Sequence, residues 1–143
     1  MNKHFAALIC LTLAGLIGIA RGGDKAAPKL DGTWTETSAT VDGKKVPDDI
    51  ISQRKIVFTF KDGKYTFSVE GKQFEAGKYK VDASKKPVPI DLLDEIDKKG
   101  TKLGVLKLDG GTLALSFNIF NPDKRPENLD GGTDIAVYFL KRK

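Results

Sequence analysis

Cysteine and histidine each occur only once in this sequence, as Cys10 and His4. Both lie in an N-terminal segment that we expect to be removed. The rest of the chain therefore lacks the side chains of Ser-His-Asp and Cys-His nucleophile systems and of ordinary zinc sites. It also has no glycine-rich phosphate loop that leads into a helix, which excludes nucleotide binding by that route. We accordingly expect no enzymatic activity, no metal and no other cofactor.

The N-terminus has the pattern of a secretory signal peptide. Lys3 and His4 precede an uncharged and mostly apolar run over residues 5–20, after which small residues offer a cleavage site. This run is shorter than the ~20 residues that a membrane-spanning helix needs. We expect residues 1–23 to form a signal helix that is cleaved, so that the exported protein is periplasmic or secreted and has no membrane span. An uncleaved membrane anchor is the alternative, and lipidation at Cys10 is disfavoured because no lipobox precedes it.

The charge that remains after cleavage is nearly balanced. Lys3 and Arg21 are two of the 24 basic residues, so their loss leaves 22 against 19 acidic ones, a net charge of +3. This excess is weak and dispersed, which argues against a nucleic-acid partner. Residues 24–29 are polar and are predicted to be a short tether. Residues 30–143 then form a single domain, which is long enough to bury a core without disulfides.

Short segments with alternating apolar residues occupy most of this domain. Ile56, Phe58 and Phe60 share one face, and Asp62-Gly63 then marks a tight hairpin. The same period of two recurs over residues 33–41, 65–69, 73–81, 88–92, 101–108, 113–119 and 135–139. About eight strands with short connections predict an all-β fold in which neighbours are antiparallel. Closure removes both exposed edges, so we expect one antiparallel β-barrel; an open sheet or a sandwich is the alternative.

The remaining segments are a helix, an acidic cluster and two loops. Pro47 and the acidic residues after it predict one short helix over residues 47–53. The acidic residues between 91 and 99 are predicted to lie in a solvated loop or turn, because the lysines that follow neutralise part of them and the spacing of a calcium site is missing. The loops over 83–89 and 120–133 are longer than a hairpin needs, and such loops often carry binding determinants.

Gly32-Thr33-Trp34 opens the first strand, and Arg142 lies near the end of the last one. This pattern resembles the lipocalin-like superfamily, in which such a tryptophan plugs the closed end of the barrel and a basic residue of the last strand lies over the indole. The resemblance implies structural roles for Gly32, Trp34 and Arg142. A guanidinium over a tryptophan face contributes about 1 kcal/mol or somewhat more when shielded.

A closer resemblance covers almost the whole predicted domain. The order and spacing of its motifs are similar to those of a planctomycete-type family of small exported lipocalin-like proteins of unknown function. The chain departs from that family at Leu106 and Lys107, where an aromatic and an acidic residue are usual, and at Ser116, where a cysteine is frequent. The resemblance implies the fold and export but no reaction. Its motifs are LDGTW (30–34), DGKK (42–45), GKYKVD (77–82), KPVPID (86–91), LDGGTL (108–113) and KRP (124–126).

Three residues are candidates for ligand binding. Arg125, held beside Pro126, is expected either to clamp an anion or carboxylate at the barrel mouth or to form a structural ion pair with Asp91. Tyr79 and Tyr138 fall out of phase with the other aromatic residues of their strands. Each is therefore expected either to face solvent or to carry its hydroxyl group into a polar pocket.

Large aromatic residues are predicted on the inner faces of the strands, where they either fill the barrel or leave room for one small ligand. We favour non-enzymatic binding of a small, partly apolar or amphipathic ligand. The alternative is an envelope or interaction module with a filled barrel and a protein partner, and a carboxylate-based enzyme is a distant third. The presence of a cavity separates the first two. The predicted inward residues include Phe58, Phe60, Tyr65, Phe67, Phe117 and Phe139.

Overall fold

The computed structural model describes residues 29–98 and 100–143, so the predicted signal helix over 1–23 and most of the tether over 24–29 lie outside it. None of the helical structure in these described ranges is long and apolar enough to cross a membrane. The described part contains nine strands and one helix: β1 (Gly32–Val41), β2 (Lys44–Lys45), α1 (Asp48–Arg54), β3 (Val57–Lys61), β4 (Lys64–Val69), β5 (Lys72–Val81), β6 (Val88–Asp94), β7 (Thr101–Asp109), β8 (Thr112–Asn118) and β9 (Ile135–Arg142).

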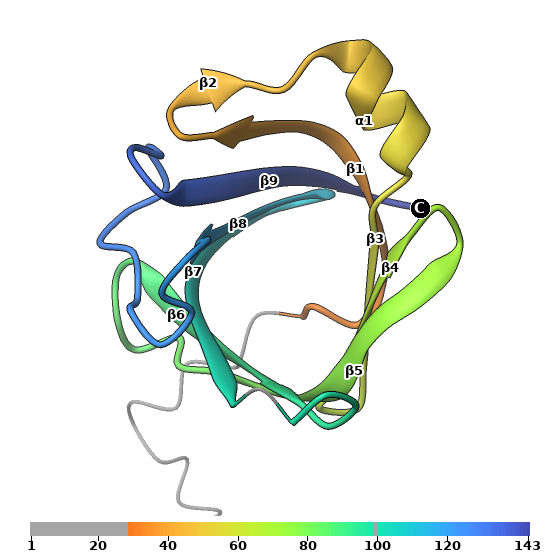
Figure 1. The fold of residues 1–143 in the computed structure, drawn as a ribbon. Coiled ribbons are helices and arrows are strands. Elements are labelled where there is room, and N and C mark those ends of the chain that lie inside the picture. Colours follow the sequence, from red (N-terminus) through yellow and green to blue (C-terminus); the bar gives the residue numbers. More distant parts are fainter. Residues whose placement is uncertain (1–28, 99) are drawn as a thin grey trace, which may run out of the picture.

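Eight of these strands form a closed ring, seen along the barrel axis in Figure 1. From β3 to β9 each strand pairs antiparallel with the next, and β1 pairs with both β3 and β9. Trp34 lies opposite Arg142 where β1 meets β9, and the register shifts between Glu36 and Ser38. The short strand β2 pairs antiparallel with the end of β1 and is not part of the ring. The prediction of a single antiparallel barrel of about eight strands is therefore confirmed.

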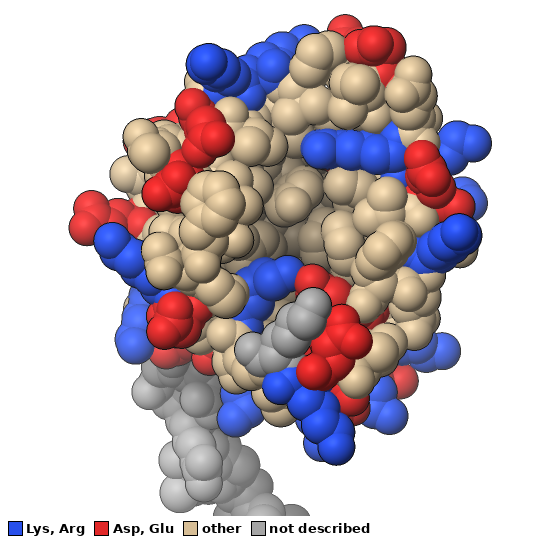
Figure 2. All heavy atoms as spheres, viewed as in Figure 1, with Lys and Arg blue, Asp and Glu red and all other residues tan. Residues whose placement is uncertain are grey.

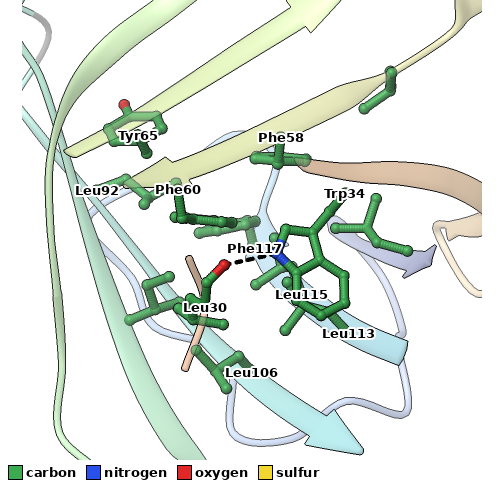
Figure 3. Packing of buried hydrophobic residues seen from close by; sticks show 13 residues of the cluster. Leu30, Trp34, Phe58, Phe60, Tyr65, Leu92, Leu106, Leu113, Leu115 and Phe117 are labelled. Atoms are coloured by element: carbon green, nitrogen blue, oxygen red, sulfur yellow. Dashed lines mark hydrogen bonds between the residues drawn. The ribbon is translucent and has the colours of Figure 1, made fainter. Parts of the chain in front are cut away.

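Inward-pointing side chains pack one half of the barrel solidly, at the end where β1 begins. Trp34 and Phe60 are fully buried there. Leu30, which precedes β1 in the chain, also packs into this core with only 1% of its surface exposed. The Trp34 indole N–H donates a hydrogen bond of 2.8 Å to the Leu30 carbonyl oxygen (Figure 3). Leucines of the later strands complete this core: Leu92, Leu106, Leu113, Leu115 and Leu140.

A glycine on β7 makes room for one of the large rings inside the barrel. Gly104 lies opposite Phe117 of β8. A Cβ atom at position 104 would lie 2.4 Å from the Phe117 ring, far inside contact distance. The lack of a side chain at Gly104 therefore makes room for the Phe117 ring against β7.

The segment over 119–134 covers part of the outer face. It is tied to the barrel by a hydrogen bond from the Leu103 N–H to the Pro122 carbonyl oxygen at 2.7 Å. On the face beneath it, Val105 and Val137 are at most 1% exposed. The inner and outer faces of β9 are therefore the reverse of the prediction. Phe139 lies on the outer face with 38% of its surface exposed, while Tyr138 points inward.

Candidate functional site

The half of the barrel opposite Trp34 contains a cavity of about 300 Å³. Figure 2 shows the hollow along the barrel axis, with charged side chains of both signs around its rim. Small-molecule pockets in proteins begin at about this volume. Its walls come from seven strands, β3 to β9, and most of its lining is apolar. The apolar lining residues include Phe58, Phe67, Leu92, Phe117, Ala136 and Tyr138.

Phe58 of β3 lies at the centre of the aromatic wall. Its ring centroid is 4.9 Å from that of Phe67 and 5.8 Å from that of Tyr138, which approaches edge-on. Phe58 also stacks on Phe60 at 6.1 Å, which connects the cavity wall to the packed half. These rings are held by one another and by the strands that carry them, so the wall is formed before any ligand arrives.

An ion pair lies on the inner wall beside these rings. Lys102 of β7 donates from its Nζ atom to the Glu75 Oε1 atom at 2.6 Å, and the two side chains are only 34% and 21% exposed. The Tyr65 hydroxyl group donates to the second carboxylate oxygen of Glu75 at 3.2 Å. Burial, together with the charges of Glu75 and Asp94, raises the pKa of Tyr65, so this hydroxyl stays protonated and available as a donor.

Asp94 brings a second carboxylate to the cavity. It ends β6, lines the cavity and is 9% exposed. Its two oxygens accept hydrogen bonds from the backbone N–H groups of Ile96 at 3.0 Å and Asp97 at 3.4 Å. The prediction that this acidic stretch is a solvated loop or turn is thus wrong for Asp91 and Asp94, because β6 includes both residues and its phase turns the Asp94 side chain inward.

A buried ion pair joins the helix to the interior of the barrel. Arg54, the last residue of α1, donates from Nε to the Glu36 Oε2 atom at 3.0 Å and from Nη2 to the Oε1 atom. The Glu36 side chain is 1% exposed. Burial raises the pKa of Glu36, while the hydrogen bonds and charge of Arg54 act in the opposite direction. The predicted helix over 47–53 is confirmed to within one residue, and this pair anchors it.

Arg125 does not line the cavity. It projects from the covering segment onto the outside of β6 and β7, where Nη1 donates to the carbonyl oxygens of Gly104 at 2.7 Å and Ile90 at 3.2 Å. Its Nη2 atom donates to the Asp91 carboxylate at 2.6 Å. The structure thus contains the ion-pair alternative, and the clamp expected at the barrel mouth is not formed by Arg125.

The two candidate tyrosines have different surroundings. Tyr138 lines the cavity, and burial raises its pKa, with Glu36 and Glu75 adding to this effect and Arg54 opposing it. Tyr79 points into the packed half instead. Its ring meets Phe60 edge-on at 5.1 Å, and its hydroxyl group donates to the Asp31 carboxylate at 3.4 Å. Burial raises the pKa of Tyr79 as well, with smaller contributions from Asp31 and Asp62.

The residues predicted to close the barrel lie together at its packed end. The Arg142 guanidinium is 4.3 Å from the centroid of the Trp34 ring. Its Nη2 atom donates to the Lys29 carbonyl oxygen at 3.0 Å. Gly32, with a φ of 136°, leaves the space that the guanidinium fills, because a Cβ atom there would lie 2.8 Å from Nη1. This is the arrangement that the sequence predicts for these three residues.

The sequence analysis missed the charged groups of the cavity. Lys102 falls in phase with Gly104 and Leu106, and Glu75 falls in phase with Tyr79, but the sequence alone does not show that these phases point into the barrel. Within residues 29–98 and 100–143, no three His, Cys, Asp or Glu side chains gather closely enough to hold a metal ion.

Comparison with known proteins gives no relative for this chain. No protein-family model matches it, and neither a curated protein nor a solved structure does. The resemblance to the planctomycete-type family therefore stays a prediction from the motifs.

Proposed function

We propose that this protein binds a small, partly apolar ligand in the cavity and carries out no reaction on it. The observation that supports this proposal is the cavity of about 300 Å³, which has a wall of aromatic rings and a few polar groups near its rim. Small-molecule sites combine these features, because apolar walls supply affinity and a few placed polar groups supply orientation.

The contrast between the two halves of the barrel supports the same proposal. Trp34 and Phe60 are fully buried in the packed half, whereas the rings of Phe58 and Phe67 line the cavity. A cavity beside apolar rings lowers the stability of the fold, because a larger side chain in that space would make additional van der Waals contacts. The chain fills one half and leaves the other hollow, as a binding barrel requires. The alternative function, an interaction module with a protein partner, predicts a filled barrel instead.

The proposal also places this binding outside the cytoplasm, in the periplasm or the medium. It rests here on the sequence of residues 1–23 alone. The mass of the protein recovered outside the bacterial cytoplasm tests it. A chain that begins near residue 24 supports export, and a protein found only in the cytoplasm with its N-terminus intact contradicts it.

The binding proposal is tested by a protein-observed NMR titration with 2-phenylethanol, a neutral probe small enough for the cavity. We expect saturable shifts at Phe58, Tyr138 and their neighbours, with a dissociation constant of roughly 1 mM or below. Ala136→Phe places a ring in the cavity from the wall of β9 and should abolish the shifts.

The matched control for that variant is Phe139→Ser, which changes the outer face of the same strand. It should leave the titration unchanged. If the probe causes no saturable shifts, or if Ala136→Phe binds it as well as the parent protein does, the cavity is not a binding site.

A further inference from the structure

Five of the described residues that line the cavity are aromatic: Phe58, Tyr65, Phe67, Phe117 and Tyr138. The face of an aromatic ring carries negative potential and attracts a cation within about 6 Å of its centroid. One such contact is already present, since the Lys102 ammonium lies 5.8 Å from the centroid of the Phe117 ring. The wall is therefore suited to hold positive charge as well as apolar groups.

The fixed charges of the described lining residues also favour a positively charged ligand. Glu75 and Asp94 contribute two carboxylates, and Lys102 contributes one ammonium group. The nearby pair of Glu36 and Arg54 is balanced within itself. These carboxylates act in a partly water-excluded space, where electrostatic interactions are stronger than at the surface. A cation that enters the cavity therefore meets a net negative lining.

An anionic ligand meets an obstacle that a cationic ligand does not. The ammonium group of Lys102 is already paired with Glu75 at 2.6 Å, so its charge is largely neutralised and a ligand carboxylate that approached it would be repelled by the Glu75 carboxylate. A ligand ammonium group can approach Asp94 without breaking this pair, because a carboxylate has about four acceptor positions and the backbone N–H groups of Ile96 and Asp97 occupy two of them.

We infer that the cavity selects organic cations, with a primary or quaternary ammonium group on a compact apolar body. The apolar body would lie among Phe58, Phe67 and Tyr138, and the charged group would lie toward Glu75 and Asp94. This inference rests on the proposed binding function and adds the chemical class of the ligand.

Three probes of similar size and different charge test it: 2-phenylethylammonium, 2-phenylethanol and 3-phenylpropanoate, each titrated by NMR at neutral pH and low salt. We expect the ammonium to bind roughly tenfold more tightly than the alcohol, which corresponds to about 1.4 kcal/mol. The propanoate should bind more weakly than the alcohol.

Two variants of the inner ion pair separate charge recognition from a structural role. Glu75→Gln leaves the Lys102 ammonium without its partner, so the preference should shift toward the propanoate. Lys102→Gln leaves the Glu75 carboxylate without its ammonium partner and should strengthen binding of the ammonium. The alcohol carries no charge, so its affinity in each variant is the reference against which the affinities of the ammonium and the propanoate are compared.

The outer surface supplies a matched control pair. Lys78 and Glu95 are 3.6 Å apart and more than half exposed. Lys78→Gln and Glu95→Gln make the same changes in net charge outside the barrel and should leave all three affinities nearly unchanged.

The possible failures are distinguishable. If the alcohol binds but the ammonium binds no better, or if Glu75→Gln and Lys102→Gln shift the preference in the same direction, the inference is wrong while the binding function stands. If none of the three probes binds, both are wrong.

Discussion

Lys102 and Glu75 form an ion pair of 2.6 Å on the inner wall of the barrel, in strand phases that otherwise carry apolar side chains and glycine. The two residues come from β7 and β5, with β6 between them. They meet near the end of β6, where the cavity opens. At the opposite end the interior is sealed by Trp34 and its neighbours. The barrel thus has a packed floor, formed by Trp34 and its neighbours, and an ion pair on the cavity wall above it. The predictions below test these two parts separately.

The packed floor depends on Trp34. Trp34→Ala removes a fully buried ring together with its hydrogen bond to Leu30 and its contact with Arg142. We expect a loss of about 3 kcal/mol or more in the free energy of unfolding, measured by urea denaturation. Phe139→Ala, which truncates an exposed ring, is the control and should lose far less. A change near zero for Trp34→Ala would show that Trp34 does not plug the barrel.

The packing of Phe117 against β7 depends on a glycine, Gly104, which has no side chain. Gly104→Ala places a methyl group against the Phe117 ring and should lower the free energy of unfolding by about 1–3 kcal/mol. Gly111→Ala is the matched control, because no atom lies within 4 Å of the added Cβ. Equal stabilities of these two variants would contradict the close contact at Gly104.

Arg125 contacts the outside of the barrel and does not line the cavity, so we expect it to stabilise the fold and to take no part in the proposed binding. Arg125→Gln removes hydrogen bonds to Ile90, Gly104 and Asp91, so the free energy of unfolding should fall by about 1–3 kcal/mol. The affinity for 2-phenylethanol should not change. Lys124→Gln, an exposed neighbour with the same change in charge, serves as the control. If Arg125→Gln keeps the stability of the parent protein but no longer binds 2-phenylethanol, Arg125 belongs to the ligand site.

Because the pKa of Tyr65 is raised, the free energy of unfolding depends on pH in the alkaline range. The folded protein holds the Tyr65 proton more tightly than the unfolded chain does, so stability falls as pH rises above about 10, the pKa of an unperturbed tyrosine. Tyr65→Phe removes the contribution of Tyr65 to this dependence, together with one hydrogen bond. The variant should be about 1 kcal/mol less stable at neutral pH.

Above pH 10 the difference between the two proteins should shrink by up to about 1.4 kcal/mol for each unit of pH. Urea denaturation at several pH values between neutral and alkaline measures this difference. Parallel stability curves for Tyr65→Phe and the parent protein would mean that the Tyr65 hydroxyl group is not buried as described.

The strands could be predicted because period two in the apolar residues is a local signal. Which face of a strand points inward is not local. In β9 the covering segment over 119–134 shields part of the outer face, so Val137 is buried outside the barrel while Tyr138 points inside. The alternation is the same in both orientations, and only the position of that segment decides between them.

The plug could be predicted from a motif, whereas the cavity could not. Gly32, Trp34 and Arg142 form a pattern at the two ends of the domain. Glu75 and Lys102 meet across an intervening strand only because the sheet curves and β6 ends at Asp94. No spacing in the sequence encodes that meeting. The placement of Arg125 likewise depends on how a long loop folds back.

Native mass spectrometry is the most direct test that the barrel is a binding protein. The protein is purified without denaturation from bacteria that express the full 143-residue chain. We expect a reproducible added mass that is lost on denaturation and is missing from the Ala136→Phe variant. A bare polypeptide mass, unchanged after incubation with lipid and small-molecule extracts, would contradict a ligand in the cavity.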